Sequence, residues 1–121
     1  MPSKKKKFNL KKLKTSRFNL KVNGKSWLIE FVGSDKISRG SWGEADWPTT
    51  RKPKIYVYAN QDEKNLVNTT IHEVLHAVRP ELSEEAVTET ADVLTDAIFK
   101  MGCRLQEVGE VVDDRPRKEK A

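Results

Sequence analysis

An Asn-Gly pair near the start of the chain predicts a β-hairpin with one apolar face. Asn23 and Gly24 favour a tight two-residue turn, and two runs of alternating side chains, 18–22 and 25–32, flank them. A turn of this length makes three pairs across the strands: Val22 with Lys25, Leu20 with Trp27, and Phe18 with Ile29. Because side chains alternate along a strand, one face of the hairpin is then apolar: Phe18, Leu20, Val22, Trp27, Ile29 and Phe31.

A loop and one more strand are expected after the hairpin. Residues 33–53 are rich in Gly, Ser, Thr and Pro, which predicts a loop. Its tryptophans, Trp42 and Trp47, are more often anchors of a loop than contacts for a substrate. The run 55–58 is rich in β-branched and aromatic residues and predicts a further strand. We therefore expect a small antiparallel sheet made of the hairpin and this strand.

The first of two expected helices has a start signal and a stop signal. Asn60, with Glu63 three residues later, resembles a capping box. Pro80 predicts an end near Arg79, because a residue before proline avoids the helical conformation. Between these limits, apolar residues recur at helical spacing: Val67, Ile71, Val74 and Val78.

The second expected helix begins after Ser83, a favoured cap, and ends at Gly102, with Lys100 suited to its negative C-terminal end. Its apolar row is Val87, Ala91, Leu94, Ile98 and Met101. Cys103 is the one cysteine, so no intrachain disulfide is possible, and we expect it to be a small core residue. Together these patterns predict an α+β fold, with the antiparallel sheet packed against two helices.

Charge divides the chain into a basic tail and a mildly acidic body. Residues 1–17 hold eight of the 23 basic residues and none of the 18 acidic residues, which leaves 15 basic and 18 acidic residues in the other 104. We expect residues 1–17 to be a disordered tail that solubilises the protein or makes a weak, salt-sensitive contact with nucleic acid. One domain is expected over residues 18–112, followed by a polar tail over residues 113–121.

Membrane insertion and secretion are both disfavoured by the pattern of apolar residues. No apolar run approaches the roughly 20 residues of a membrane span. The lysines near the N-terminus are not followed by the apolar stretch of a secretory signal. We therefore expect a cytoplasmic protein that makes no membrane contact.

The first helix carries the residues that point to chemistry. His72, Glu73 and His76 form an H-E-x-x-H motif, and these are the only two histidines of the chain. Four residues of spacing bring both imidazoles to one face of a helix, where they can bind one zinc ion. The alternative is two histidines that serve only the packing of a helix.

A catalytic zinc site also needs a third protein ligand and an open position for water. With no further histidine, we expect a carboxylate from the start of the second helix, and the nearby candidates are Glu81, Glu84, Glu85 and Glu89. Glu84 opens the apolar row and should face the first helix, whereas Glu85 and Glu89 lie on the polar face. We therefore predict Glu84 as the third ligand. The alternative is that Glu84 faces solvent and is simply a first-turn acid favoured by the helix dipole.

The segments TTIHEVLHA and LSEEAV resemble the H-E-x-x-H zincin metallopeptidases, in the gluzincin-like form with a downstream glutamate. The order of elements over roughly residues 27–104 is similar to compact metallopeptidase-like proteins of bacteriophages and, more distantly, to SprT-like and ImmA-like domains. The resemblance implies zinc on His72 and His76, Glu73 as general base, and an antiparallel strand beside the active-site helix that binds an extended peptide. The short spacing to Glu84 departs from the larger gluzincins.

The function expected from these residues is zinc-dependent hydrolysis of peptide bonds in a peptide or protein substrate. Glu73 takes a proton from a water whose pKa zinc lowers to about 7, and returns it to the leaving amine. Tyr56, Tyr58 and Arg79 are candidate donors to the oxyanion, although strand packing is the commoner role for the tyrosines. An exposed edge on the strand 55–58 would pair with the substrate backbone.

Two other functions are compatible with the same residues. One is a non-catalytic, zinc-containing adaptor whose basic tail contacts nucleic acid or a host protein. The other is a zinc hydrolase that acts on a bond other than a peptide bond. Glu73 favours an enzyme over the adaptor, because structural zinc sites fill all four positions with protein ligands and need no base.

Overall fold

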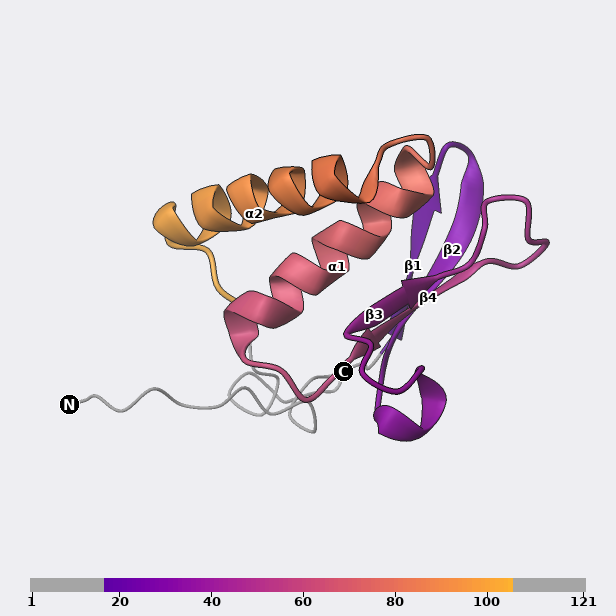
Figure 1. Ribbon diagram of the computed structural model, residues 1–121, viewed down its shortest axis with the longest axis horizontal. Helices are drawn as coiled ribbons and strands as arrows, with labels where there is room; N and C mark the ends of the chain where they lie inside the picture. The colour runs from indigo at the N-terminus through magenta and orange to yellow at the C-terminus, as the bar shows by residue number, and fades with distance from the viewer. Residues whose placement is uncertain (1–16, 106–121) are drawn as a thin grey trace, which may run out of the picture.

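A four-stranded sheet is covered on one face by two helices (Figure 1) in the computed structural model, which describes residues 17–105. The strands are β1 (Arg17–Val22), β2 (Lys25–Val32), β3 (Gly43–Ala45) and β4 (Lys54–Tyr58). The helices are α1 (Glu63–Val78) and α2 (Glu84–Lys100). The α+β class is therefore confirmed. Residues 1–16 of the expected N-terminal tail lie outside the described residues, as do residues 106–121. Arg17, which was expected to belong to the tail, is the first residue of β1.

The sheet is mixed rather than antiparallel, which corrects the sequence-based expectation. Its strand order is β1-β2-β4-β3, with β2 and β4 parallel and the other two pairs antiparallel. Parallel neighbours need a connection that returns to the end of the sheet where the first strand began. Residues 33–53 make that return, and within them lie a short 3-10 helix (Ser34–Lys36) and β3. The expected loop thus contributes a strand.

The hairpin has the register expected from its turn. Val22 pairs with Lys25, Leu20 with Trp27, and Phe18 with Ile29. Asn23 and Gly24 have φ values of 50° and 82°, the two positive values that a type I′ turn requires. In the apolar face, Val22, Trp27 and Ile29 are buried, whereas Phe18 stays 39% exposed and packs on the ring of Phe31.

Both helices are capped, and one cap differs from the expectation. The carboxylate of Asp62, not the side chain of Asn60, accepts the backbone N–H of Asn65 at 2.8 Å. The chain turns just before this point, because the N–H of Gln61 bonds the carbonyl of Ala59, so the helix cannot begin as early as Asn60. At the other end, α1 stops before Pro80 as expected, and Ser83 caps α2 through the N–H of Ala86.

The buried faces of the helices are turned slightly from those expected. In α1 the buried residues are Leu66, Glu73 and Ala77, while the expected row, Val67, Ile71, Val74 and Val78, is half-buried. The cause is that α1 packs against β3 and β4 on one side and against α2 on another, so no single stripe is its interior.

In α2, Val87 and Ala91 are buried as expected, but Thr95 continues the row in place of Leu94 and Met101, which are 43% and 77% exposed. Cys103 is exposed and is therefore not a core residue. The hydroxyl of Thr95 accepts a hydrogen bond from the Asn68 amide, which also bonds Asp92 at 2.9 Å. A buried hydroxyl with a partner costs little, so a polar residue can replace leucine at this contact.

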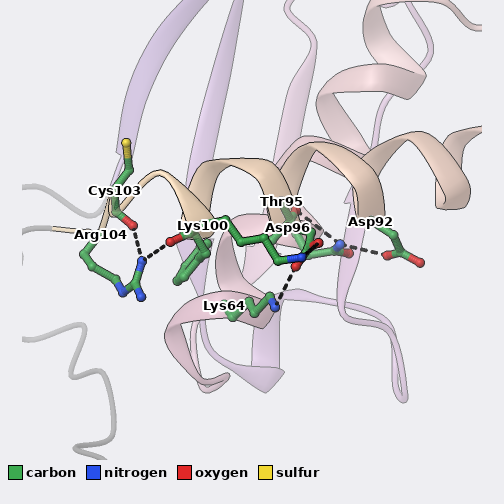
Figure 2. A network of polar contacts seen from close by, with 9 residues as sticks. Lys64, Asp92, Thr95, Asp96, Lys100, Cys103 and Arg104 are labelled. Carbon is green, nitrogen blue, oxygen red and sulfur yellow. Dashed lines mark hydrogen bonds and ion pairs between the residues drawn. The ribbon is translucent and has the colours of Figure 1, made fainter.

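Polar contacts fasten the start of α1 to the end of α2 (Figure 2). Lys64 of α1 pairs with Asp96 at 3.6 Å, and Asp96 pairs with Lys100 one turn further along α2 at 3.1 Å. The guanidinium of Arg104 donates to the carbonyls of Phe99 and Cys103. The Lys64–Asp96 pair thus joins the two helices at the end that lies away from the H-E-x-x-H motif, whereas the Lys100 and Arg104 contacts lie within the end of α2. No helix in residues 17–105 is long and apolar enough to cross a membrane.

Candidate metal centre

Helix α1 places His72 and His76 one above the other on the same face. Residues four apart on a helix are neighbours, and the two ring centroids lie 4.9 Å apart in an edge-on arrangement. Their side chains are 17% and 28% exposed, so they lie at the margin of the core rather than within it. Both rings turn their Nε2 atoms towards the start of α2.

Glu84, the first residue of α2, reaches both imidazoles. One carboxylate oxygen lies 2.9 Å from Nε2 of His72 and the other lies 3.0 Å from Nε2 of His76. The connection of five residues between the helices, with the Ser83 cap at its end, brings the first turn of α2 beside the last turns of α1. The structure therefore places Glu84 where the helix-face argument predicts a third ligand.

The other candidate carboxylates lie elsewhere. Glu81 pairs with Arg79 at 2.8 Å, and Glu85 and Glu89 are exposed on α2. Among the described residues, the group with ligand atoms close enough to hold one ion is His72, His76 and Glu84, whose atoms lie within 4.8 Å of one another. Two imidazole nitrogens and a carboxylate oxygen are a donor set that zinc accepts. Tetrahedral ligands at zinc distances are about 3.3 Å apart, so small side-chain movements would open this cluster to the ion.

Glu73 lies beside the cluster, buried between α1 and the edge of the sheet. It is 8% exposed and has no partner cation among the described residues. Burial, followed by the negative charges of Glu84 and Glu44, raises the pKa of Glu73 from 4.5 to about 7. A carboxylate with a pKa near neutrality can both accept and release a proton at physiological pH.

Gly43 of β3 is the residue that allows Glu73 to be buried here. A Cβ atom at position 43 would lie 2.8 Å from Cγ of Glu73 and 2.7 Å from Cγ2 of Thr69, both too close for a normal contact. Only glycine lets a strand approach the helix to this distance. Sequence reasoning missed Gly43 because it counted the residue as part of a loop; the run Gly43–Ala45 is too short to show strand periodicity.

The edge strands of the sheet are β1 and β3, not the strand of residues 55–58, which corrects the expectation, and β3 is the edge strand that lies beside Glu73 of α1. Strand β4 is interior, since β2 and β3 pair with its two sides. Gly43 faces α1 and pairs with Val57, so alternation turns Tyr56 and Tyr58 to the face away from α1. The tyrosines are therefore strand residues and not oxyanion donors, and Arg79 is engaged by Glu81.

Two hollows flank Glu73, one towards each end of β3. The first, of about 310 Å³, we call the Trp47 hollow; its lining is Ala45, Asp46, Trp47, Pro48, Glu73, His76, Pro80 and Leu82. The second, of about 350 Å³, we call the Ser41 hollow; its lining is Gly40, Ser41, Trp42, Gly43, Asn68, Thr69, His72, Glu73 and Glu84. The candidate metal ligands therefore border both hollows: His76 lines the Trp47 hollow, and His72 and Glu84 line the Ser41 hollow.

No protein-family model, curated protein or solved structure matches this chain. The resemblance of the H-E-x-x-H segment to the zincins therefore stays a prediction.

Proposed function

We propose that this protein is a zinc-dependent metallopeptidase. The observation that carries the proposal is the position of Glu73: this buried carboxylate, which has no cation partner within residues 17–105, lies beside a cluster of two imidazoles and the Glu84 carboxylate. A structural metal site has no use for such a group, whereas hydrolysis needs a base next to the metal.

The chemistry divides between the metal and the chain. Bound zinc supplies Lewis acidity, which lowers the pKa of a ligand water to about 7. Glu73 accepts a proton from the attacking water, whose oxygen forms a bond with the carbonyl carbon of the peptide. Glu73 then delivers that proton to the amide nitrogen as the C–N bond breaks, so that a carboxylic acid and an amine leave.

A peptide is the substrate class that fits the sheet edge. Strand β3 pairs with β4 on one side, and no other strand within residues 17–105 pairs with it; it lies against α1 at Glu73. The Gly43 carbonyl accepts a hydrogen bond from the Ser41 hydroxyl at 3.1 Å. An extended peptide can add to such an edge through main-chain hydrogen bonds. This pairing would hold the peptide alongside the two hollows, with a carbonyl near the metal ligands.

The direct test is the Glu73→Gln variant, loaded with zinc and compared with the parent on a mixture of unfolded proteins. We expect the parent to cleave the mixture and the variant to lose about 1,000-fold in rate, because the glutamine side chain cannot accept or return the proton although zinc stays bound. Zinc content should be equal in the two proteins. A Glu85→Ala variant, which changes an exposed carboxylate outside the cluster, is the matched control and should keep full activity.

The outcomes separate the three functions. Cleavage of esters but not of peptides would support the hydrolase with another bond as its target. A zinc-loaded parent that acts on neither class would favour the non-catalytic adaptor. Activity retained in Glu73→Gln would exclude Glu73 as the base and overturn the proposed mechanism.

A further inference from the structure

Trp47 is held in a fixed position but has most of its surface in solvent. Trp47 is 73% exposed, whereas Trp27 in the core is 1% exposed. The N–H of Thr50 bonds the Trp47 carbonyl at 2.9 Å, which closes a turn. The ammonium of Lys25 donates to the carbonyls of Pro48 and Thr50, at 2.7 Å and 3.0 Å, and ties the turn to β2. A large apolar ring on an anchored turn loses little entropy when it binds a partner.

The Trp47 hollow combines apolar residues with residues of the H-E-x-x-H motif. Trp47 and Pro48 line it together with Pro80 and Leu82, from the connection between the helices. Glu73 and His76 belong to the same lining. A side chain that fills this hollow therefore belongs to a residue next to the bond that Glu73 would help to cleave. The volume, about 310 Å³, suits a large side chain.

The Ser41 hollow, on the other side of Glu73, has a different lining. Glycines and short polar side chains surround it, and Glu84 and His72 close it. Trp42 is part of this lining, but its ring packs on Tyr58, with centroids 5.9 Å apart, and Tyr58 faces away from α1. The two hollows on either side of Glu73 therefore differ in the kind of residue that lines them.

We propose that the Trp47 hollow is a specificity pocket that receives a large aliphatic or aromatic side chain on one side of the scissile bond, with no comparable selection on the other side. This inference rests on the proposed peptidase function and adds the class of residue that it recognises. Asp46 and Glu73 line the hollow, so an acidic side chain is disfavoured by like charge as well as by the apolar walls.

Cleavage preference provides the first test. The bonds that the zinc-loaded parent cleaves in an unfolded protein are located first. Two peptides are then made around one of these bonds, with either Phe or Ala at the position where the cleaved sites show the strongest residue preference. We expect the parent to favour Phe by about tenfold or more in kcat/KM, and Trp47→Ala to reduce that ratio to about twofold, with little change for the Ala peptide. Met101→Ala is the matched control, since Met101 is 77% exposed on the far end of α2, and it should keep the parent ratio.

Binding provides a second test that does not need turnover. Zinc-loaded Glu73→Gln protein is titrated with the same two peptides while its tryptophan emission is recorded. We expect the Phe peptide to shift the emission to shorter wavelength. The added substitution Trp47→Phe, which leaves the buried Trp27 and the 58% exposed Trp42 in place, should remove most of that shift. The Ala peptide should produce little change.

The results test the specificity pocket separately from the proposed peptidase function. A parent that cleaves peptides with the same Phe-to-Ala ratio as Trp47→Ala overturns the pocket and leaves the peptidase intact. A parent that cleaves nothing overturns the peptidase, and the emission titration is then made with two extended peptides that differ only in a central Phe or Ala: a shift that depends on Trp47 supports the pocket, and an absent or Trp47-independent shift overturns it.

Discussion

Gly43 of β3 lies directly against the side chain of Glu73 on α1, with room for no further atom between them. This contact sets the distance between the free strand edge and the proposed general base. It also contributes to the burial that raises the pKa of Glu73, because β3 lies against the carboxylate.

Gly43→Ala should therefore damage both stability and activity. The added methyl would have to displace β3 or the side chains of Thr69 and Glu73, at a cost of about 1–3 kcal/mol in the free energy of unfolding. Urea unfolding measures that loss, and peptide hydrolysis should fall by more than the unfolded fraction explains. Gly33→Ala is the control: Gly33 has a φ of −82°, and its new Cβ would meet only the mobile Asp35 carboxylate, at 3.2 Å. Equal stability of the two variants would contradict this account.

The raised pKa of Glu73 makes the metal-free protein less stable at high pH. The folded protein binds a proton at Glu73 up to about pH 7, whereas the unfolded chain releases it near pH 4.5, so the free energy of unfolding should fall as the pH rises between these values. With allowance for partial solvent contact, the loss is about 2 kcal/mol by pH 8.

Comparison with Glu73→Gln isolates this contribution, because other titrating groups are common to both proteins. In the presence of a chelator, the free energy of unfolding of the variant should rise by about 2 kcal/mol relative to that of the parent between pH 4.5 and pH 8. Urea unfolding across this range is the measurement. A difference between the two proteins that stays constant with pH would show that Glu73 is not destabilised by its burial.

Metal binding should depend on Glu84 and not on Glu85. Both residues lie in the first turn of α2, but only Glu84 contacts the imidazoles. Zinc content of protein purified without chelator should therefore fall in Glu84→Ala and stay at the parent level in Glu85→Ala.

The same pair of variants can be followed by thermal unfolding. Zinc at a hundredfold excess over its Kd stabilises a folded protein by about 2.7 kcal/mol, and we expect Glu84→Ala to lose most of that gain. Loss of zinc in Glu85→Ala alone would show that the ligand was assigned to the wrong carboxylate. Equal zinc content in the parent and both variants would show that Glu84 is not a zinc ligand.

Asn23 has two separable roles at the tip of the hairpin. Its positive φ forms the turn, and its side-chain amide donates to the carbonyl of Val78 at 3.2 Å, at the end of α1. Asn23→Gly should keep the turn and lose the hydrogen bond, at a cost of up to about 1 kcal/mol. Asn23→Ala should cost more, because alanine disfavours a positive φ. Chemical denaturation of both variants measures the order, and a more stable Asn23→Ala would contradict it.

Features that depend on short stretches of sequence were predictable. The hairpin register follows from the turn length, and the end of α1 follows from Pro80, because both are effects of neighbouring residues. The common face of His72 and His76 follows from helix geometry, and Glu84 faces them because it begins the inward row of α2.

Other features were decided only when distant surfaces met. The parallel pairing of β2 with β4 and the edge position of β3 depend on the path of residues 33–53, for which no local pattern exists. Glu73 is buried because β3 packs on α1, and glycine at position 43 reads in the sequence as any loop glycine. Periodicity and turn chemistry thus determined which residues share a face, whereas burial and neighbouring charge, which set the proton affinity of Glu73, arose from long-range packing.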